Sequence, residues 1–115
     1  MIYLFCGSRD WTDKRKIDRR MAKLGPDDCL VEGGAPGADT ISGVCADMRG
    51  IPHCTFRANW MFYGRAAGLI RNGWMLRFGR PDRVVAFHSN IAASKGTADM
   101  VARARRAGVK VEVVK

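Results

Sequence analysis

The loop formed by residues 33–37, Gly-Gly-Ala-Pro-Gly, has the residue types and spacing that suit phosphate binding. An apolar run over 29–31 precedes it, and an amphipathic stretch over 39–49 follows it, which is typical of a strand, a loop and a helix. Glycines let the backbone approach a ligand closely and adopt positive φ. The free N–H groups at the start of a helix favour an anion. We therefore expect this loop to help hold a nucleotide or a nucleotide-derived compound.

The spacing Gly33-Gly34-x-x-Gly37 matches neither the G-x-G-x-x-G dinucleotide pattern nor the Gly-Lys-Ser/Thr ending of a Walker A loop. A tight turn without any ligand is therefore the alternative interpretation. Asp39 has two candidate roles, since it can cap the following helix or accept hydrogen bonds from a ribose.

A second candidate phosphate site lies at Ser94-Lys95-Gly96-Thr97. Here Thr97 can cap a helix while Lys95 supplies positive charge. Both glycine loops follow strands, so we expect them at one edge of a sheet, where they would form two anion sites side by side.

Charged and amide side chains accompany both loops. Gly7, Ser8 and Arg9 follow the first expected strand, and Arg9 suits bidentate phosphate binding or an ion pair with a nearby aspartate. Arg71 and Asn72 lie near the start of a later helix, where they suit a phosphate or a base edge. For Asn72, a structural hydrogen bond is the alternative.

Histidine and aromatic residues add further candidates. His53 is expected to be structural, whereas His88 ends a strand and faces the expected site. The aromatic residues Trp60, Phe62 and Tyr63 can stack on a base, or they can belong to the core or to an interface.

The elements that position these residues alternate regularly. We expect strands over about 2–6, 29–32, 53–57, 83–87 and 109–114. We expect helices from Thr12, as N-cap, to Leu24, over 39–49, from about Gly68 to Phe78, and over 98–107. This order predicts one α/β domain over residues 1–115, a three-layer sandwich with a five-stranded, mostly parallel sheet and helices on both faces. Ligands of such sheets bind beyond the carboxyl ends of the strands.

The composition indicates which ligands, which cell compartment and which state of the cysteines to expect. The 20 lysine and arginine residues exceed the 11 acidic ones, giving a net charge of +9 that attracts phosphorylated ligands. No apolar run approaches the ~20 residues of a membrane span, and no signal peptide is evident, so we expect a cytoplasmic protein. The four cysteines form no C-x-x-C pair, and we expect them to be reduced and buried, without a metal.

Six motifs in order resemble the YspA-like branch of the SLOG superfamily, which includes the DprA/Smf and LOG proteins. These motifs are residues 7–11, 33–39, 66–75, 81–82, 86–88 and 94–101. The resemblance implies a Rossmann-like fold that binds nucleotides or nucleotide-derived ligands, in phage or bacterial proteins that sense or process them, some in conflict systems.

The LOG relatives cleave the N-glycosidic bond of nucleoside monophosphates, and their motifs match this chain only in part. Arg71 and Met75 agree with an Arg-Lys-x-x-Met stretch, but Asn72 replaces its lysine. Gly96-Thr97 agrees with a Pro-Gly-Gly-x-Gly-Thr-x-x-Glu stretch, whereas Met100 stands in place of the glutamate. The resemblance therefore supports phosphate binding more than hydrolysis.

Our first hypothesis is a binding domain for a nucleotide-derived ligand. The residues expected to hold phosphate or sugar are Gly7, Ser8, Arg9, Gly33, Gly34, Gly37, Asp39, Arg71, Asn72, Ser94, Lys95, Gly96 and Thr97. The first alternative is a nucleotide N-glycosidase that uses Asp39 or Asp99 as its catalytic carboxylate. The second is DprA-like binding of single-stranded DNA. We also expect a homodimer or higher homo-oligomer, because the aromatics exceed what one small core needs.

Overall fold

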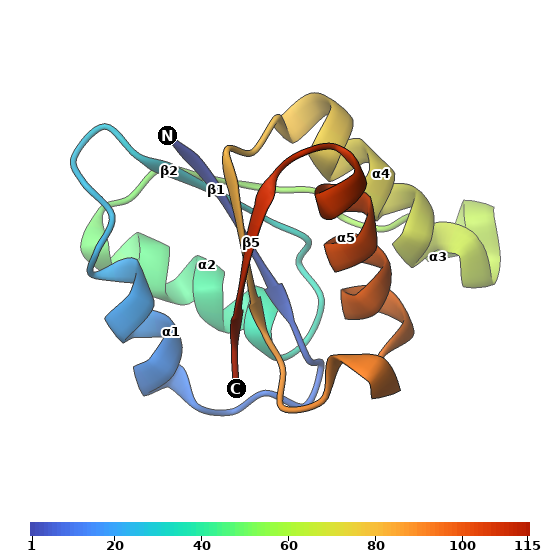
Figure 1. Ribbon diagram of the computed structural model, residues 1–115, viewed down its shortest axis with the longest axis horizontal. Helices are drawn as coiled ribbons and strands as arrows, with labels where there is room; N and C mark the ends of the chain where they lie inside the picture. The colour runs from blue at the N-terminus through green and yellow to red at the C-terminus, as the bar shows by residue number, and fades with distance from the viewer.

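The computed structural model describes residues 1–115 as a five-stranded sheet between two layers of helices (Figure 1). All neighbouring strands are parallel, and their order is β3-β2-β1-β4-β5. The strands are β1 (Ile2–Gly7), β2 (Cys29–Glu32), β3 (His53–Thr55), β4 (Arg83–Phe87) and β5 (Lys110–Val114). The expected Rossmann-like α/β fold is confirmed, and its sheet is wholly parallel.

Four longer helices cover the two faces of the sheet. These helices are α1 (Lys14–Met21), α2 (Ala38–Arg49), α4 (Ala67–Gly79) and α5 (Lys95–Arg106). Figure 1 shows α1 and α2 on one face and α4 and α5 on the other. The short helix α3 (Trp60–Tyr63) projects outward beyond α4, and 3-10 turns occupy Gly64–Ala66 and Ile91–Ala93.

The alternation of side chains along the central strands explains both helical layers. In β1, Leu4 and Cys6 pack toward α4 and α5, whereas Phe5 packs toward α1 and α2. Both faces of the strand are buried, so its sequence is apolar throughout. The strand β4 repeats this division between Val84 and Val85. The core is therefore split into two layers by the sheet itself.

Two helix caps differ from the expected ones. Asp13, not Thr12, caps α1, and its carboxylate accepts the Lys16 N–H at 3.2 Å. Ser94, not Thr97, caps α5, and its hydroxyl accepts the Thr97 N–H at 3.1 Å. In each case the chosen residue lies three positions before the N–H that it binds, which is the spacing a side-chain cap requires.

The segment between β3 and α4 also differs from expectation. We expected a strand to residue 57 and an irregular connection after it, but β3 ends at Thr55 and α3 forms at Trp60. Asn59 caps α3 by accepting the Phe62 N–H at 3.1 Å. A single helical turn leaves no periodic apolar pattern, so the sequence gives no strong signal for it.

The cysteines are all free, but they are not all buried. Cys6 and Cys45 are buried, Cys29 is partly exposed, and Cys54 is exposed on the edge strand β3. The expectation of uniform burial is therefore wrong for Cys54, because an edge strand has no neighbour on one side. None of the helices is both long and apolar enough to cross a bilayer.

Candidate functional site

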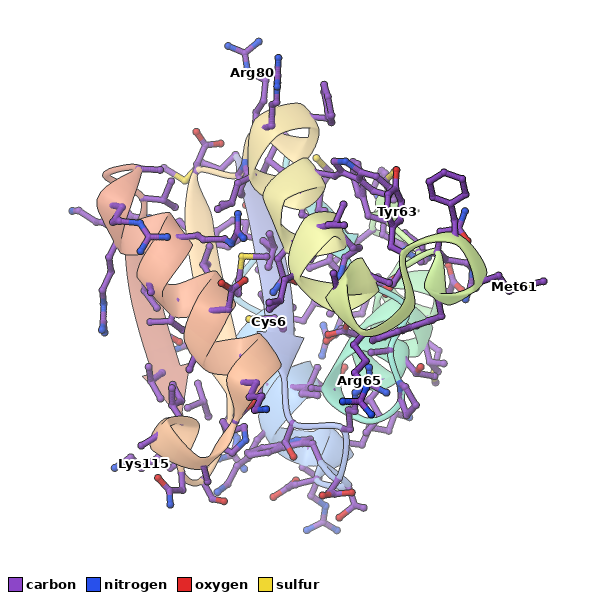
Figure 2. All side chains as sticks on the ribbon, turned by 90° about the vertical axis from the view of Figure 1, so that its right-hand side faces the viewer. Cys6, Met61, Tyr63, Arg65, Arg80 and Lys115 are labelled. Atoms are coloured by element: carbon purple, nitrogen blue, oxygen red, sulfur yellow. The ribbon has the colours of Figure 1, made fainter.

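A cleft of about 440 Å³ lies where the carboxyl ends of β1 and β4 meet the starts of α4 and α5. The chain turns outward from β1 to β2 and β3 and then returns to β4, so the loops after β1 and β4 diverge here. In Figure 2, Cys6 lies on the sheet between α4 and α5, and its side chain forms part of the cleft floor. The edge of the sheet that is expected to bind a ligand therefore carries a cleft lined by the loops after β1 and β4.

The structure brings most of the expected site residues together. Those that line the cleft are Gly7, Ser8, Arg9, Asp39, Arg71, Asn72, Ser94, Lys95, Gly96 and Thr97. The three glycines of the first loop, Gly33, Gly34 and Gly37, do not line it.

The first glycine loop differs from the expected anion site because its amides bind the protein's own oxygens. The Gly34 N–H donates to the Glu32 carboxylate at 2.7 Å, and the Ala35 N–H donates to the Asp39 carboxylate at 3.3 Å. The Ala38 N–H donates to the Ser8 carbonyl at 3.0 Å. In this conformation the loop is a closed turn, which is the alternative the sequence left open.

Gly37 shows why this turn requires glycine. Its φ is +78°, and an added Cβ would collide with the carbonyl oxygens of Ser8 and Arg9. The loop after β1 therefore packs directly on the start of α2. The glycine supports the wall of the cleft without contacting its interior.

Arg71 is a buried arginine that joins the first loop to the cleft. Only 7% of the residue is exposed. Its Nη1 donates to the carbonyls of Gly33 and Phe56, and its Nε donates to the Asn72 side chain at 3.2 Å. Its Nη2 has no partner in the protein. Burial lowers the pKa of Arg71, and the nearby Asp39 opposes that shift. A buried guanidinium with an unpartnered NH₂ group on a cleft wall is suited to bind an anion or a hydroxyl.

Asn72 fixes the second loop. Its Nδ2 donates to the Gly96 carbonyl at 3.1 Å and to the Asp99 carboxylate at 3.1 Å. Asp99 also accepts from Arg103 Nε at 2.8 Å, and Asp99 does not line the cleft. Of the two carboxylates considered as catalytic, Asp99 therefore has structural partners: it forms an ion pair with Arg103 within α5 and accepts a hydrogen bond from Asn72 of α4.

The second loop leaves two backbone donors free. The Thr97 N–H is bound by Ser94, and the Ala98 N–H donates to the Ser94 carbonyl at 3.3 Å. The N–H groups of Lys95 and Gly96 have no acceptor in the protein, and the space beside Gly96 is open. These donors open the 12-residue helix α5, whose dipole favours negative charge at this end.

Asp39 is the buried carboxylate of the cleft. The residue is 5% exposed, and burial raises its pKa to about 6, against the lowering effects of Arg71 and the loop amides. The expected cap geometry is not formed at the helix start, because Gly37 is the N-cap and the Asp39 carboxylate turns back to Ala35. Near pH 6 this carboxyl can therefore exist in both protonation states.

Positive charge exceeds negative charge inside the cleft. Arg9, Arg65, Arg71 and Lys95 line it, against Asp10 and Asp39. None of these four cations forms an ion pair with a carboxylate within the chain, so their charge is available to a ligand. His88 also lines the cleft, and its Nδ1 faces the Asn90 N–H at 2.9 Å.

Apolar floor residues were not part of the expected site. Cys6, Met75 and Met100 lie under the cleft and are almost completely buried. Their residue types give no sign of a ligand site. Only their positions, at a strand end or on the inner face of α4 or α5, could have predicted that they lie under the cleft. Met100 occupies the position compared above with the LOG glutamate, so the cleft presents a thioether there.

The fold and the site together define a Rossmann-like α/β domain with an anion-attracting cleft at the carboxyl edge of its sheet. A model of the YspA, cpYpsA-related SLOG family matches residues 1–63. The Gene 61 protein of Mycobacterium phage D29 is 32% identical over 117 residues, covering 94% of this chain and 91% of the phage protein. The chain belongs to the YspA, cpYpsA-related SLOG family.

Family membership implies a nucleotide-related ligand-binding domain. The matched residues supply the β1 loop, the first glycine loop and α3. Arg71, Asn72 and the second loop lie beyond the family-model match, within the region aligned to the phage protein.

Proposed function

We propose that this protein binds a nucleotide or nucleotide-derived ligand in the cleft, with a phosphate at the start of α5. The Lys95 and Gly96 N–H groups donate to the phosphate, and the Lys95 side chain adds charge. The observation that carries this proposal is the convergence of these free donors with the unpartnered Nη2 of buried Arg71 in one cleft. Asp39 accepts a sugar hydroxyl on the same wall.

The cleft also has a suitable size. Its volume of about 440 Å³ lies within the ~300–1,000 Å³ that small-molecule sites occupy. The residues around it provide donors on one side and apolar surface on the floor, which is the combination that orients a ligand with a charged end. This proposal gives the phosphate to the second glycine loop rather than to both loops.

Titration calorimetry with mono-, di- and cyclic nucleotides, ADP-ribose and NAD tests the proposal. We expect saturable heat with at least one of them, and at least about 10-fold weaker binding in Lys95→Ala, because a charge-assisted contact is lost. Lys110→Ala is the matched control, since Lys110 is exposed at the opposite, amino-terminal edge of the sheet. Absence of heat with every compound would reject the proposal.

Asp39 favours hydrolysis of an N-glycosidic bond as a second candidate function. It is a buried carboxyl that lines the cleft, with a pKa raised to about 6, whereas Asp99 is tied to Arg103 outside the cleft. A carboxylate near the sugar can stabilise an oxocarbenium-like transition state. Chromatography of nucleoside monophosphates after long incubation tests this function. Base release that Asp39→Asn abolishes supports it, and unchanged substrate with the wild-type protein rejects it while leaving binding intact.

The protein also presents an apolar surface suited to self-association. Met61 is fully exposed, and the exposed fractions of Phe62 and Phe78 are 77% and 62%. Figure 2 shows Met61 pointing away from the body at the outer end of α3. We propose that a second copy of the chain covers this surface.

Single-stranded DNA binding stays a prediction from the net charge of the chain. Its signature would be an affinity that falls steeply as the salt concentration rises.

A further inference from the structure

Trp60 is placed differently from the other residues of α3. None of the four residues of this helix is buried. Met61 and Phe62 lie outside the cleft, but Trp60 lines it with 47% of its surface exposed. A large aromatic ring half in solvent at the edge of a polar cleft is not explained by core packing, since core rings are covered.

Two neighbours hold the Trp60 ring at the cleft. Its edge lies against the first turn of α4, where a Cβ added at Gly68 would be 3.3 Å from the ring. The guanidinium carbon of Arg9, from the loop after β1, lies 5.3 Å from the ring centroid. Arg9 is exposed and has no carboxylate partner, so it faces the ring as a cation over a π surface.

We propose that Trp60 and Arg9 form a base subsite, in which a nucleobase takes the place of the Arg9 guanidinium on the Trp60 indole and the exposed Arg9 side chain moves outward to stack on the other face of the base. This inference rests on the proposed function, since the phosphate of the same ligand lies at the start of α5. The ligand class is then a nucleoside phosphate rather than a sugar phosphate.

Chemical considerations support this arrangement. Aromatic side chains and the planar guanidinium of arginine both stack on flat π systems, and every base has such a face. The subsite therefore selects for the presence of a base with little preference for its identity. Trp60 and Lys95 line the same cleft from different elements, α3 and α5, so one ligand can contact both.

The experiment compares adenosine, guanosine, cytidine and uridine monophosphates with ribose 5-phosphate, which lacks a base. For the wild-type protein we expect the nucleotides to bind at least about 5-fold more tightly, because the stacked base makes a favourable contact that ribose 5-phosphate cannot make. Trp60→Ala should raise the Kd values of the nucleotides to the Kd of ribose 5-phosphate. The Kd of ribose 5-phosphate itself should not change. Trp60→Phe should keep most of the difference, because it retains an aromatic ring.

Phe62→Ala is the matched control, because it removes an exposed ring from the same helix outside the cleft. It should leave the affinities for the nucleotides and for ribose 5-phosphate unchanged. Lys95→Ala, in contrast, should weaken the binding of both kinds of ligand by the same factor. If the nucleotides bind and Trp60→Ala leaves their advantage over ribose 5-phosphate intact, the base subsite is wrong and the proposed function stands. If none of the four monophosphates binds more tightly than ribose 5-phosphate to the wild-type protein, the base subsite is wrong, and the wider nucleotide panel decides the proposed function separately.

Discussion

Arg71 and Asn72, adjacent residues in α4, bind the two glycine loops separately. Arg71 Nη1 donates to the Gly33 carbonyl of the first loop, and Asn72 Nδ2 donates to the Gly96 carbonyl of the second at 3.1 Å. Consecutive residues on a helix point about 100° apart, which lets one turn of α4 contact loops that follow different strands. The helix α4 therefore sets the relative position of the two loops.

Asn72→Ala should destabilise the fold and loosen the second loop. It leaves the buried Nε of Arg71 and the Asp99 carboxylate each without one partner, so we expect a loss of about 1–3 kcal/mol in the free energy of unfolding. Urea denaturation measures this loss, and hydrogen exchange at the Thr97 and Ala98 amides, which are bonded to Ser94, should accelerate. Arg77→Ala, exposed on the same helix, is the control and should change neither quantity. Equal stability of Asn72→Ala and the wild type would show that Asn72 does not hold the loop.

Gly37→Ala should be much more destabilising than Gly50→Ala. Both glycines have positive φ, at +78° and +68°. Gly50 is in the left-handed helical region, where a substitution costs roughly 1–2 kcal/mol in backbone strain, and Gly37, with ψ of −125°, lies outside that region, where an L-residue is strained at least as much. A Cβ added at Gly37 would also collide with the carbonyls of Ser8 and Arg9. A Cβ added at Gly50 would have no atom within 4 Å. We expect the contact at Gly37 to add about 1–3 kcal/mol. Urea denaturation of both variants gives the difference, and equal losses would contradict the close packing of the two loops.

The fold follows from the sequence because its signals are periodic and local. The apolar runs at β1 and β4 match strands buried on both faces, and the loops after them carry the glycine and polar residues that reach the cleft. Parallel strands place those loops at one edge whatever the details of packing. The expected position of the cleft therefore needs only strand direction.

The hydrogen-bond acceptor of each N–H group in the loops could not be predicted from the sequence in this way. The Gly34 N–H is taken by Glu32, which also accepts the Thr55 hydroxyl from the neighbouring strand. Whether a glycine loop is open or closed thus depends on a carboxylate at the end of β2 and on its tertiary contacts. Likewise, Asp99 pairs with Asn72 of a different helix, a contact that sequence spacing does not reveal.

The stability of the protein should depend on pH through Asp39. The folded-state pKa is raised to about 6, above the ~3.9 of an unfolded aspartate, so the folded state binds the proton more tightly. This contribution to stability is fully present below about pH 4 and is lost as the pH rises through about 6. Relative to the wild type, Asp39→Asn should therefore gain up to about 3 kcal/mol between pH 4 and pH 7.

Urea denaturation of the wild type and Asp39→Asn at pH 4, 5, 6 and 7 measures this effect. Asp27→Asn is the control, because Asp27 is exposed and forms no hydrogen bond or ion pair. Its difference from the wild type should stay constant over the same range. A constant difference for Asp39→Asn would mean that the carboxyl has the same proton affinity in both states.

The exposed apolar side chains of α3, together with Phe78 near the end of α4, should hold copies of the chain together. The apolar side chains of Met61, Phe62 and Phe78 remain in solvent in the single chain, and covering them would yield roughly 25 cal/mol for each Å² removed from water. Light scattering after size exclusion should give a mass above the 12.7 kDa of one chain.

The double substitution Met61→Ser with Phe62→Ser should return the mass to that of a monomer, with an unchanged circular dichroism spectrum. Val44→Ser, on the outer side of α2, should leave the assembly intact, because this residue is equally apolar but lies on the opposite helical layer. A wild-type protein that stays monomeric at high concentration would show that these side chains are simply exposed.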